Sequence, residues 1–485
     1  MKVLITYPPL LSDKGLPCLS QNRQFQWFNN PSFFYPIVPA STATLLHRSG
    51  FEVSWKDAIV EGAGWGDYGR FIAAEKPDVV AMETKTPVVK MHWDIITHMK
   101  EMMPGAKFVL MGDHVTAFPE ESMKKCPALD YVITGGDYDF SLLGICRHLE
   151  KKEKLPAGIW YRKAGKISST GKFRLEHDLN TLPLIDRELT MARLYDKEYN
   201  IKRKPFAYTM AGRDCPYHKC RFCAWPVMFP SFRARSPESL LDEIGMLIEK
   251  YHVKEVFDDT GTFPPGAWLE KFCKGMTERG YNKKIRLSCN MRVDYINEKN
   301  AALMRKAGFR LLKVGLESGN QKTLDRINKG IKVEQIVKAC ETAKKAGLEI
   351  HLTMIIGYPW ETKADAMKTF ALAKWLMTSG RADVLQSTVL VPYPGTPLWQ
   401  EGVEKKWFRF NPREYERYDM REPVFKTQGY DPFEICNMVY GIFTSPKYAL
   451  KKLAEVRSLS DVKYLALGAK AVLGHKKDFS GRKRE

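Results

Sequence analysis

Three of the ten cysteines in this chain fall within nine residues, at Cys215, Cys220 and Cys223. Three thiolates on one short loop can hold three irons of a cubane iron–sulfur cluster and leave the fourth iron without a protein ligand. A substrate-like molecule can then chelate that iron. Structural zinc is the alternative: His218 lies inside the loop, but no second Cys or His pair follows at the spacing of a zinc finger or ribbon. The grouping favours the iron–sulfur cluster over zinc.

The other seven cysteines stand singly, mostly among apolar or helical residues, at Cys18, Cys126, Cys146, Cys273, Cys289, Cys340 and Cys436. A single cysteine in such surroundings is a small buried hydrophobe or an idle thiol. The sequence therefore assigns chemistry to the three grouped cysteines, and it identifies no catalytic residue beyond these ligands.

Length and composition are those of a globular protein with a basic surface. The 485 residues suffice for two or three domains, and the hydrophobic share of 44% is ordinary. A net charge of +20 suits nucleic acid, an acidic lipid surface or phosphorylated substrates, and it equally suits plain solubility. No apolar run approaches the ~20 residues that a membrane span needs. We therefore expect a cytoplasmic protein without a cleaved signal.

Residues 1–150 alternate short apolar strands with helical segments. This pattern predicts an α/β fold, a doubly wound parallel sheet with helices on both faces. In such sheets ligands bind beyond the carboxyl ends of the strands. The expected strands are Lys2–Thr6, Glu52–Lys56, Asp78–Glu83, Lys107–Met111 and Tyr131–Thr134. The ends that follow three of them are polar or rich in glycine: Thr84–Pro87, Gly112–His114 and Gly135–Tyr138.

A second alternation occupies residues 201–400, after a connector over residues 151–200 that contains a hairpin. Six strand–helix units predict a partial (β/α)6 barrel with its chemistry at the carboxyl ends of the strands. Residues 401–485 are then predicted to form a helical and basic region. The expected barrel strands are Phe206–Ala211, Glu255–Asp258, Ile285–Asn290, Leu311–Gly315, Ile350–Ile356 and Ser387–Val391.

The cysteine loop resembles the signature loop of radical S-adenosylmethionine (SAM) enzymes, in which three cysteines bind a 4Fe–4S cluster and SAM chelates the open iron. The resemblance rests on Cys215-Pro-Tyr217 and on Phe222 directly before Cys223. One feature departs from the usual pattern: four residues, not three, separate Cys215 from Cys220. This departure lengthens the loop by one residue and leaves the ligand count unchanged.

Other segments resemble the family's SAM-contacting positions, and they occur in order at successive expected strand ends. They are Phe257–Thr260, Asn290–Arg292, Gly315–Gly319 and Met354–Glu361. Each is weak alone, because turn glycines and single carboxylates are common. The resemblance covers about residues 200 to 400 and implies SAM contacts at Phe222, Asp258, Asp259, Thr260, Asn290, Arg292, Glu317, Ser318 and Ile356. It also implies reductive cleavage of SAM to a 5′-deoxyadenosyl radical, with a reduced ferredoxin or flavodoxin-type electron donor.

The N-terminal region resembles the cobalamin-binding domain of one radical SAM subgroup, through Tyr7-Pro-Pro9, Pro77–Val80 and Asp130–Gly135. The D-x-H-x-x-G motif that supplies a cobalt ligand in mutases is absent. Small residues at the strand ends let backbone approach a flat ring. The alternative is a sheet that binds nothing. The resemblance implies cobalamin contacts at Thr84, Thr86, Gly112, Asp113, His114, Gly135 and Gly136.

If cobalamin binds, methyl transfer to an unactivated carbon of a small-molecule or lipid-like substrate is the leading reaction. A radical oxidation, cyclisation or rearrangement without methyl transfer is the runner-up. A tRNA-modifying methylthiotransferase would need a second three-cysteine set and a C-terminal β-barrel, which this sequence does not predict. A zinc or DNA-binding protein would leave the barrel motifs unexplained, so we expect no DNA partner.

The basic tail allows two interpretations. Segments 446–453 and 461–473 place Leu, Val and Tyr at helical spacing between Lys and Arg residues. They form either a cap on the barrel or a basic amphipathic surface for peripheral membrane contact or a lipid-like substrate. Five aromatic residues near the N-terminus either pack in the core or line an apolar cavity: Trp27, Phe28, Phe33, Phe34 and Tyr35.

Overall fold

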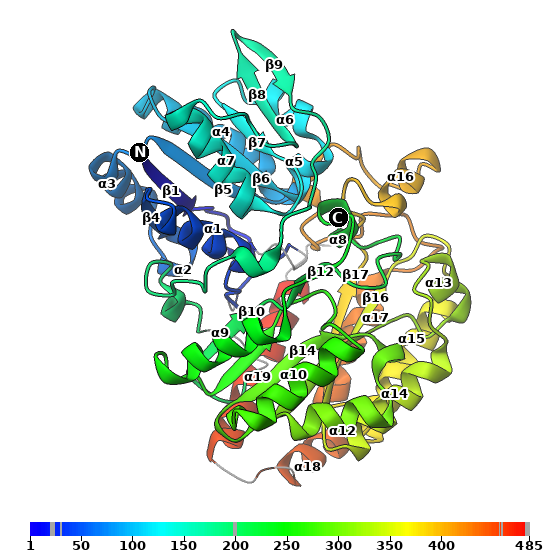
Figure 1. Cartoon of the computed structure of the whole chain (residues 1–485). Helices are drawn as coiled ribbons and strands as arrows, with labels where there is room; N and C mark the ends of the chain where they lie inside the picture. The colour runs from blue at the N-terminus through cyan, green and yellow to red at the C-terminus, as the bar shows by residue number, and fades with distance from the viewer. Residues whose placement is uncertain (20–24, 30–31, 197–200, 455, 457–458, 481–485) are drawn as a thin grey trace.

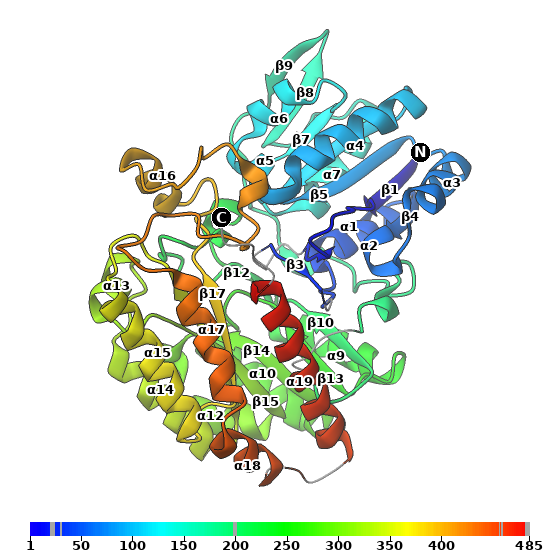
Figure 2. The same cartoon turned by 180° about the vertical axis from the view of Figure 1, so that it is seen from behind.

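The computed structural model describes residues 1–19, 25–29, 32–196, 201–454, 456 and 459–480. An N-terminal α/β unit lies beside a larger barrel-like unit, and the C-terminal helices cover one side of the barrel (Figures 1 and 2). The expected class, a doubly wound parallel sheet followed by a partial barrel and a helical C-terminal region, is confirmed. No described helix combines the length and the apolar character that crossing a bilayer requires.

The N-terminal unit is a seven-stranded sheet in the order β4-β1-β5-β6-β7-β8-β9. Its first five strands are parallel, as the sequence predicts, and the predicted hairpin adds β8 and β9 as antiparallel edge strands. The strands are β1 (Lys2–Tyr7), β4 (Glu52–Asp57), β5 (Val79–Thr84), β6 (Lys107–Gly112), β7 (Tyr131–Ile133), β8 (Ile159–Lys163) and β9 (Lys166–Ser169). Every residue of β5 is buried, as expected for a central strand covered on both faces.

Helices cover both faces of this sheet (Figures 1 and 2). One face carries α1 and α7, which pack against each other, and the other carries α3 and α4, which line one cavity. The first four residues of α1, Ile37, Val38, Pro39 and Ala40, are all buried in the core. The helices are α1 (Ile37–Arg48), α2 (Ala58–Glu61), α3 (Trp65–Glu75), α4 (Val89–Met102), α5 (Asp113–Ala117), α6 (Pro119–Lys125) and α7 (Tyr138–Lys151).

The second unit is an open barrel of six parallel strands that follow one another in chain order, β10-β13-β14-β15-β16-β17. The strands are β10 (Phe206–Thr209), β13 (Glu255–Asp258), β14 (Arg286–Met291), β15 (Phe309–Glu317), β16 (Glu349–Ile356) and β17 (Val384–Val389). Strand β17 begins three residues before the predicted start. The buried Asp383 fixes this start, because its backbone N–H bonds to Ile350 and its carboxylate to Lys344, 2.9 Å away.

Helices surround the barrel, and the tail packs on it. Between the strands lie α8 (Trp225–Met228), α9 (Pro237–Glu249), α10 (Ala267–Glu278), α11 (Tyr281–Lys284), α12 (Glu298–Lys306), α13 (Gln321–Arg326), α14 (Val333–Lys345) and α15 (Lys363–Thr378). The chain ends in α16 (Pro397–Glu404), the 3₁₀ turn η5 (Tyr415–Arg417), α17 (Pro432–Phe443), α18 (Pro446–Ala454) and α19 (Leu459–Ser480). Helix α17 contacts β16 and β17, and α19 contacts α17 and the short strand β3 (Trp27–Phe28).

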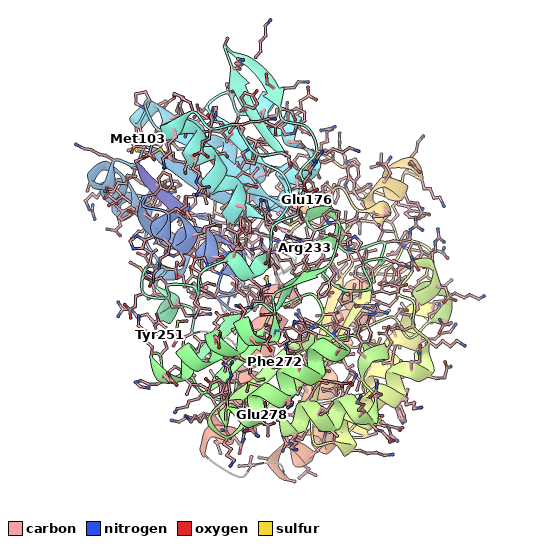
Figure 3. All side chains as sticks on the ribbon, viewed as in Figure 1. Met103, Glu176, Arg233, Tyr251, Phe272 and Glu278 are labelled. Carbon is pink, nitrogen blue, oxygen red and sulfur yellow. The ribbon has the colours of Figure 1, made fainter. Side chains whose placement is uncertain are left out.

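Buried ion pairs join the two units next to the cysteine loop. Arg213 lies between Asp137, 2.5 Å away, and Asp139, and Arg233 binds Asp137 at 2.7 Å. Figure 3 shows Arg233 where the N-terminal unit meets the barrel. Arg213 and both carboxylates are buried. The paired charges therefore fix the start of the cysteine loop against the N-terminal sheet.

Replacing Arg213 by Met should destabilise the protein strongly. Two buried carboxylates would lose a cation, and breaking a buried pair from one side costs about 3–5 kcal/mol. The matched control is Arg70→Met, which removes an exposed partner of Asp67 and should cost less than ~1 kcal/mol. Urea denaturation checks both variants, and equal midpoints for the two would contradict a structural role for the Arg213 pairs.

Candidate active site

The cysteine loop runs from β11 (Gly212–Arg213), which pairs with β12 (Arg233–Ala234), to the start of α8. Two of its residues, Asp214 (φ 75°) and His218 (φ 56°), adopt the left-handed conformation, and His218 Nδ1 bonds the Asp214 carboxylate. Non-glycine residues rarely adopt this conformation. The loop thus begins in a tight turn that is closed by the Asp214–His218 contact.

The three cysteines are partly buried on this loop. Cys215 Sγ lies 3.2 Å from Thr262 Oγ1, and burial raises the pKa of the Cys223 thiol to about 12. Among the described residues, no group of three or more His, Cys, Asp or Glu side chains surrounds a point where one metal ion would sit. A cubane instead bonds each thiolate to a different iron. Three soft thiol donors spread along one loop fit such a cluster.

Two cations and a carboxylate lie beside the cysteines. Lys329 Nζ is 2.7 Å from Glu317 Oε1, and both side chains are almost completely buried. Burial opposes the charge on Lys329, but the Glu317 carboxylate and the Cys220 thiol hold its pKa above the usual value. The Arg292 guanidinium lies 3.8 Å from the centre of the Tyr217 ring and donates to the Lys329 carbonyl at 3.0 Å. Arg292 also binds the Asp294 carboxylate at 3.0 Å, so each of the two cations beside the loop has a carboxylate partner.

Backbone geometry at the end of β15 shapes this group. The pairing of β15 with β16 shifts register between Gly315 and Glu317, and Glu317 adopts φ 56°. The Glu317 side chain crosses Gly315 so closely that a Cβ on Gly315 would lie 2.0 Å from Oε1. A side chain at position 315 would therefore push the Glu317 carboxylate and the Lys329 ammonium group out of their present positions. Sequence reasoning missed Lys329, for which the only local signal is the turn glycine Gly330 that follows it.

A cavity of about 290 Å³ lies at the carboxyl ends of the barrel strands. Four predicted SAM contacts line it: Phe222, Asn290, Arg292 and Glu317. Its lining also includes Cys18, Gln26, Phe28, Ser32 and Phe34 from the N-terminal unit. Of the five aromatic residues singled out in the sequence, Phe28 and Phe34 therefore line a cavity, whereas Trp27, Phe33 and Tyr35 are core.

The other predicted SAM contacts lie around this cavity and hold its walls together. The buried Asp258 accepts from Thr209 Oγ1 at 2.8 Å and from Thr260 Oγ1 at 2.6 Å, while Gly212 N–H donates to Thr260 at 3.0 Å. Asp259 is buried at the same strand end, 3.4 Å from Asn290 Nδ2. These contacts fix the cysteine loop to the end of β13.

Ser318 and Ile356 are both fully buried. Ser318 Oγ bonds Glu361 at 3.2 Å, and burial raises the pKa of Glu361 to about 7. On β16 the cavity is lined by Thr353 and Ile355, and neighbouring residues of a strand point to opposite sides. A SAM contact through the side chains of Ser318 or Ile356 remains a prediction.

The carboxyl edge of the N-terminal sheet is covered by protein. Gly136 N–H bonds the carbonyl of Met228 in α8 at 2.9 Å. A Cβ at Gly136 would lie 2.1 Å from the Phe229 ring, and one at Gly135 would lie 2.6 Å from the Phe173 ring. In this structure these two glycines accommodate aromatic rings of the protein itself.

The remaining predicted cobalamin contacts, Thr84, Thr86, Gly112, Asp113 and His114, are also buried. His114 bonds Thr86 Oγ1 at 3.3 Å and its ring packs 4.4 Å from that of Tyr415 in η5; burial lowers its pKa to about 3. Lys85 pairs with Asp113 at 3.4 Å. Residues of α8, the Phe229 ring and Tyr415 of η5 therefore lie against this edge of the sheet. These seven contacts remain predictions.

Comparisons with known proteins identify the barrel unit. Residues 211–373 match the model of the radical SAM superfamily. An uncharacterized methyltransferase of Pyrococcus horikoshii is 28% identical to this chain, over 87% of this chain and 90% of the relative's length. The anaerobic magnesium-protoporphyrin IX monomethyl ester cyclase of Cereibacter sphaeroides is 25% identical over 78% of this chain and 65% of its own.

Two solved structures share the whole fold. The radical SAM methyltransferase TsrM of Kitasatospora setae, with cobalamin and a 4Fe–4S cluster bound, superposes with a TM-score of 0.67 at 15% identity over 99% of this chain and 100% of TsrM. The cobalamin-dependent SAM radical enzyme OxsB superposes with a TM-score of 0.67 at 14% identity, over 97% of this chain and 71% of OxsB. The three-cysteine loop, the open barrel and these matches agree, and the chain is an enzyme of the radical SAM class whose radical SAM domain follows an N-terminal α/β unit.

Proposed function

We propose that the chain cleaves SAM reductively at a 4Fe–4S cluster held by Cys215, Cys220 and Cys223 and uses the radical to methylate an unactivated carbon. The observation that supports this most directly is the position of the three thiols beside the buried Arg292, Lys329 and Glu317. When bound, the cluster and SAM supply one electron and a 5′-deoxyadenosyl radical that abstracts hydrogen.

The residues of the cavity are suited to hold a zwitterion. Arg292 and Lys329 offer positive charge to a carboxylate, and Glu317 offers negative charge to an ammonium group, which are the two charged ends of the methionine moiety. Phe222 and Trp225 line the wall next to the loop and exclude water from the reacting atoms. Gly261 and Thr262, which follow the predicted contact Thr260, complete this wall.

The methyl assignment is supported by relatives. The Pyrococcus relative and TsrM carry the name methyltransferase, whereas the Cereibacter relative is a cyclase. Cyclisation or another radical oxidation without methyl transfer is therefore the second candidate, favoured by the covered edge of the N-terminal sheet. Anaerobic assays of cell extract with SAM labelled in its methyl group separate the two, because only methyl transfer puts the label into the product.

An enzyme of this class requires a reductant and a substrate. We propose a reduced ferredoxin or flavodoxin-type donor and a small-molecule or lipid-like substrate. The C-terminal helices α18 and α19 expose Leu450, Leu453, Val462, Leu467 and Leu473 among lysines, which suits peripheral contact with an anionic membrane.

Cobalamin binding follows from the likeness to TsrM and OxsB and remains a proposal. We expect anaerobically reconstituted protein to bind cobalamin stoichiometrically, and Phe229→Ala to bind it more tightly, because this variant removes the ring over Gly136. Absorption of protein-bound cobalamin after gel filtration measures both. If neither protein retains cobalamin, cobalt-dependent methyl transfer is no longer the favoured reaction.

A further inference from the structure

A second and larger cavity, of about 540 Å³, lies between the last barrel strand and the C-terminal helices. Its walls are β17, α17, α18 and α19, and Figure 2 shows α17 and α19 side by side on this flank of the barrel. Among the described strands β10 and β17 do not pair, so the barrel is open at β17. The cavity is thus built where the barrel does not close on itself.

The lining of this cavity is mainly apolar. Strand β17 contributes Leu385, α17 contributes Val439 and Phe443, and α19 contributes Leu465 and Val472. Such a volume is typical of small-molecule sites, which are 300–1,000 Å³ and mostly hydrophobic. The walls offer an occupant van der Waals contact and removal from water.

Ion pairs close one end of the cavity. Lys202 binds Glu349 at 2.7 Å, and Asp383 is bound by Lys344 at 2.9 Å and by Lys452 at 3.5 Å. Because these charges already have partners in the protein, they need no counter-charge from a ligand. This polar end therefore closes the cavity and supplies no charged group for binding a ligand.

The cavity shares one lining residue with the SAM cavity, and it opens to solvent at another place. Gln386 lines both this cavity and the SAM cavity, and its buried Oε1 has no hydrogen-bond partner among the described residues. At the outer side, Leu453 and Leu473 line the cavity although they are 64% and 63% exposed. The cavity is thus open toward solvent beside α18 and α19, and Gln386 separates its inner end from the catalytic cavity.

From this juxtaposition we infer that the cavity binds the hydrocarbon chain of the enzyme's substrate, a long-chain or isoprenoid lipid whose reacting carbon lies beyond Gln386. The inference rests on the proposed function, since it names the substrate class for the same active site. The occupant is uncharged along its length, because the apolar walls would leave a charge unpaired. Gln386 offers a hydrogen-bond acceptor to a polar group where the chain meets the catalytic cavity.

The test uses the reconstituted full-length enzyme and a neutral, dansyl-labelled long-chain alcohol, whose fluorescence rises in apolar surroundings. Two variants, Ala449→Trp in α18 and Ala469→Trp in α19, fill the cavity from different helices. Two controls, Leu450→Trp and Leu467→Trp, place the same ring at nearby exposed positions that are not among the residues lining the cavity. We expect saturable binding that the filling variants weaken by about tenfold or more and the controls leave unchanged.

Equal binding by all four variants, or no saturable binding by wild-type enzyme, would overturn the inference, because the probe would then adsorb elsewhere or not at all. SAM cleavage is measured on the same samples and should be unchanged in the filling variants. If wild-type enzyme does not cleave SAM but binds the probe saturably, and the filling variants weaken this binding, the proposed function is overturned while the inference of a lipid site still holds.

Discussion

Cys220→Ala should lose the absorption of the 4Fe–4S cluster and reduce SAM cleavage to the rate seen without protein. Three thiolates leave one iron open for SAM, and with two thiolates the loop cannot hold the cluster in that form. The measurements are iron and sulfide content after anaerobic reconstitution and the yield of 5′-deoxyadenosine with dithionite as reductant.

Cys340→Ala is the matched control, because Cys340 is also a thiol but is buried in α14, outside the loop. It should keep both the cluster and SAM cleavage. A Cys220→Ala protein that retained the full cluster spectrum, or wild-type protein that contained zinc in place of iron, would disprove the assignment of the loop.

Lys329→Met should weaken SAM binding by roughly thirtyfold, or about 2 kcal/mol, the lower end of the effect of removing one partner from a buried charge pair. The variant removes a cation and leaves Glu317 buried without its partner at 2.7 Å. Equilibrium dialysis with SAM on the reconstituted enzyme measures the change.

Lys332→Met, three residues further on and exposed, should bind SAM as the wild type does. Lys329→Arg keeps the positive charge and should recover part of the affinity. Unchanged affinity in Lys329→Met, with the cluster intact, would show that Lys329 stabilises only the end of β15 and does not contribute to SAM binding.

Local patterns in the sequence predicted most of the framework. The spacing of Cys215, Cys220 and Cys223 is a property of nine consecutive residues, so the cluster loop could be read directly. The eleven parallel strands could also be predicted, because each buried strand is a short apolar run between helical segments. The observed start of a strand differs from the predicted one where a contact with a distant residue fixes it, as the contacts of Asp383 do at the start of β17.

The tertiary structure decided which side chains meet. Lys329 and Glu317 are 12 residues apart and pair at the end of β15, where the strand shifts register. The sequence could not show that Phe229 would lie over Gly136, a contact across 93 residues, or that α19 would flank the open side of the barrel. The physical reason is the same in each case: chain-local preferences fix strands and helices, whereas contacts between distant side chains depend on register and packing, which exist only in the folded chain.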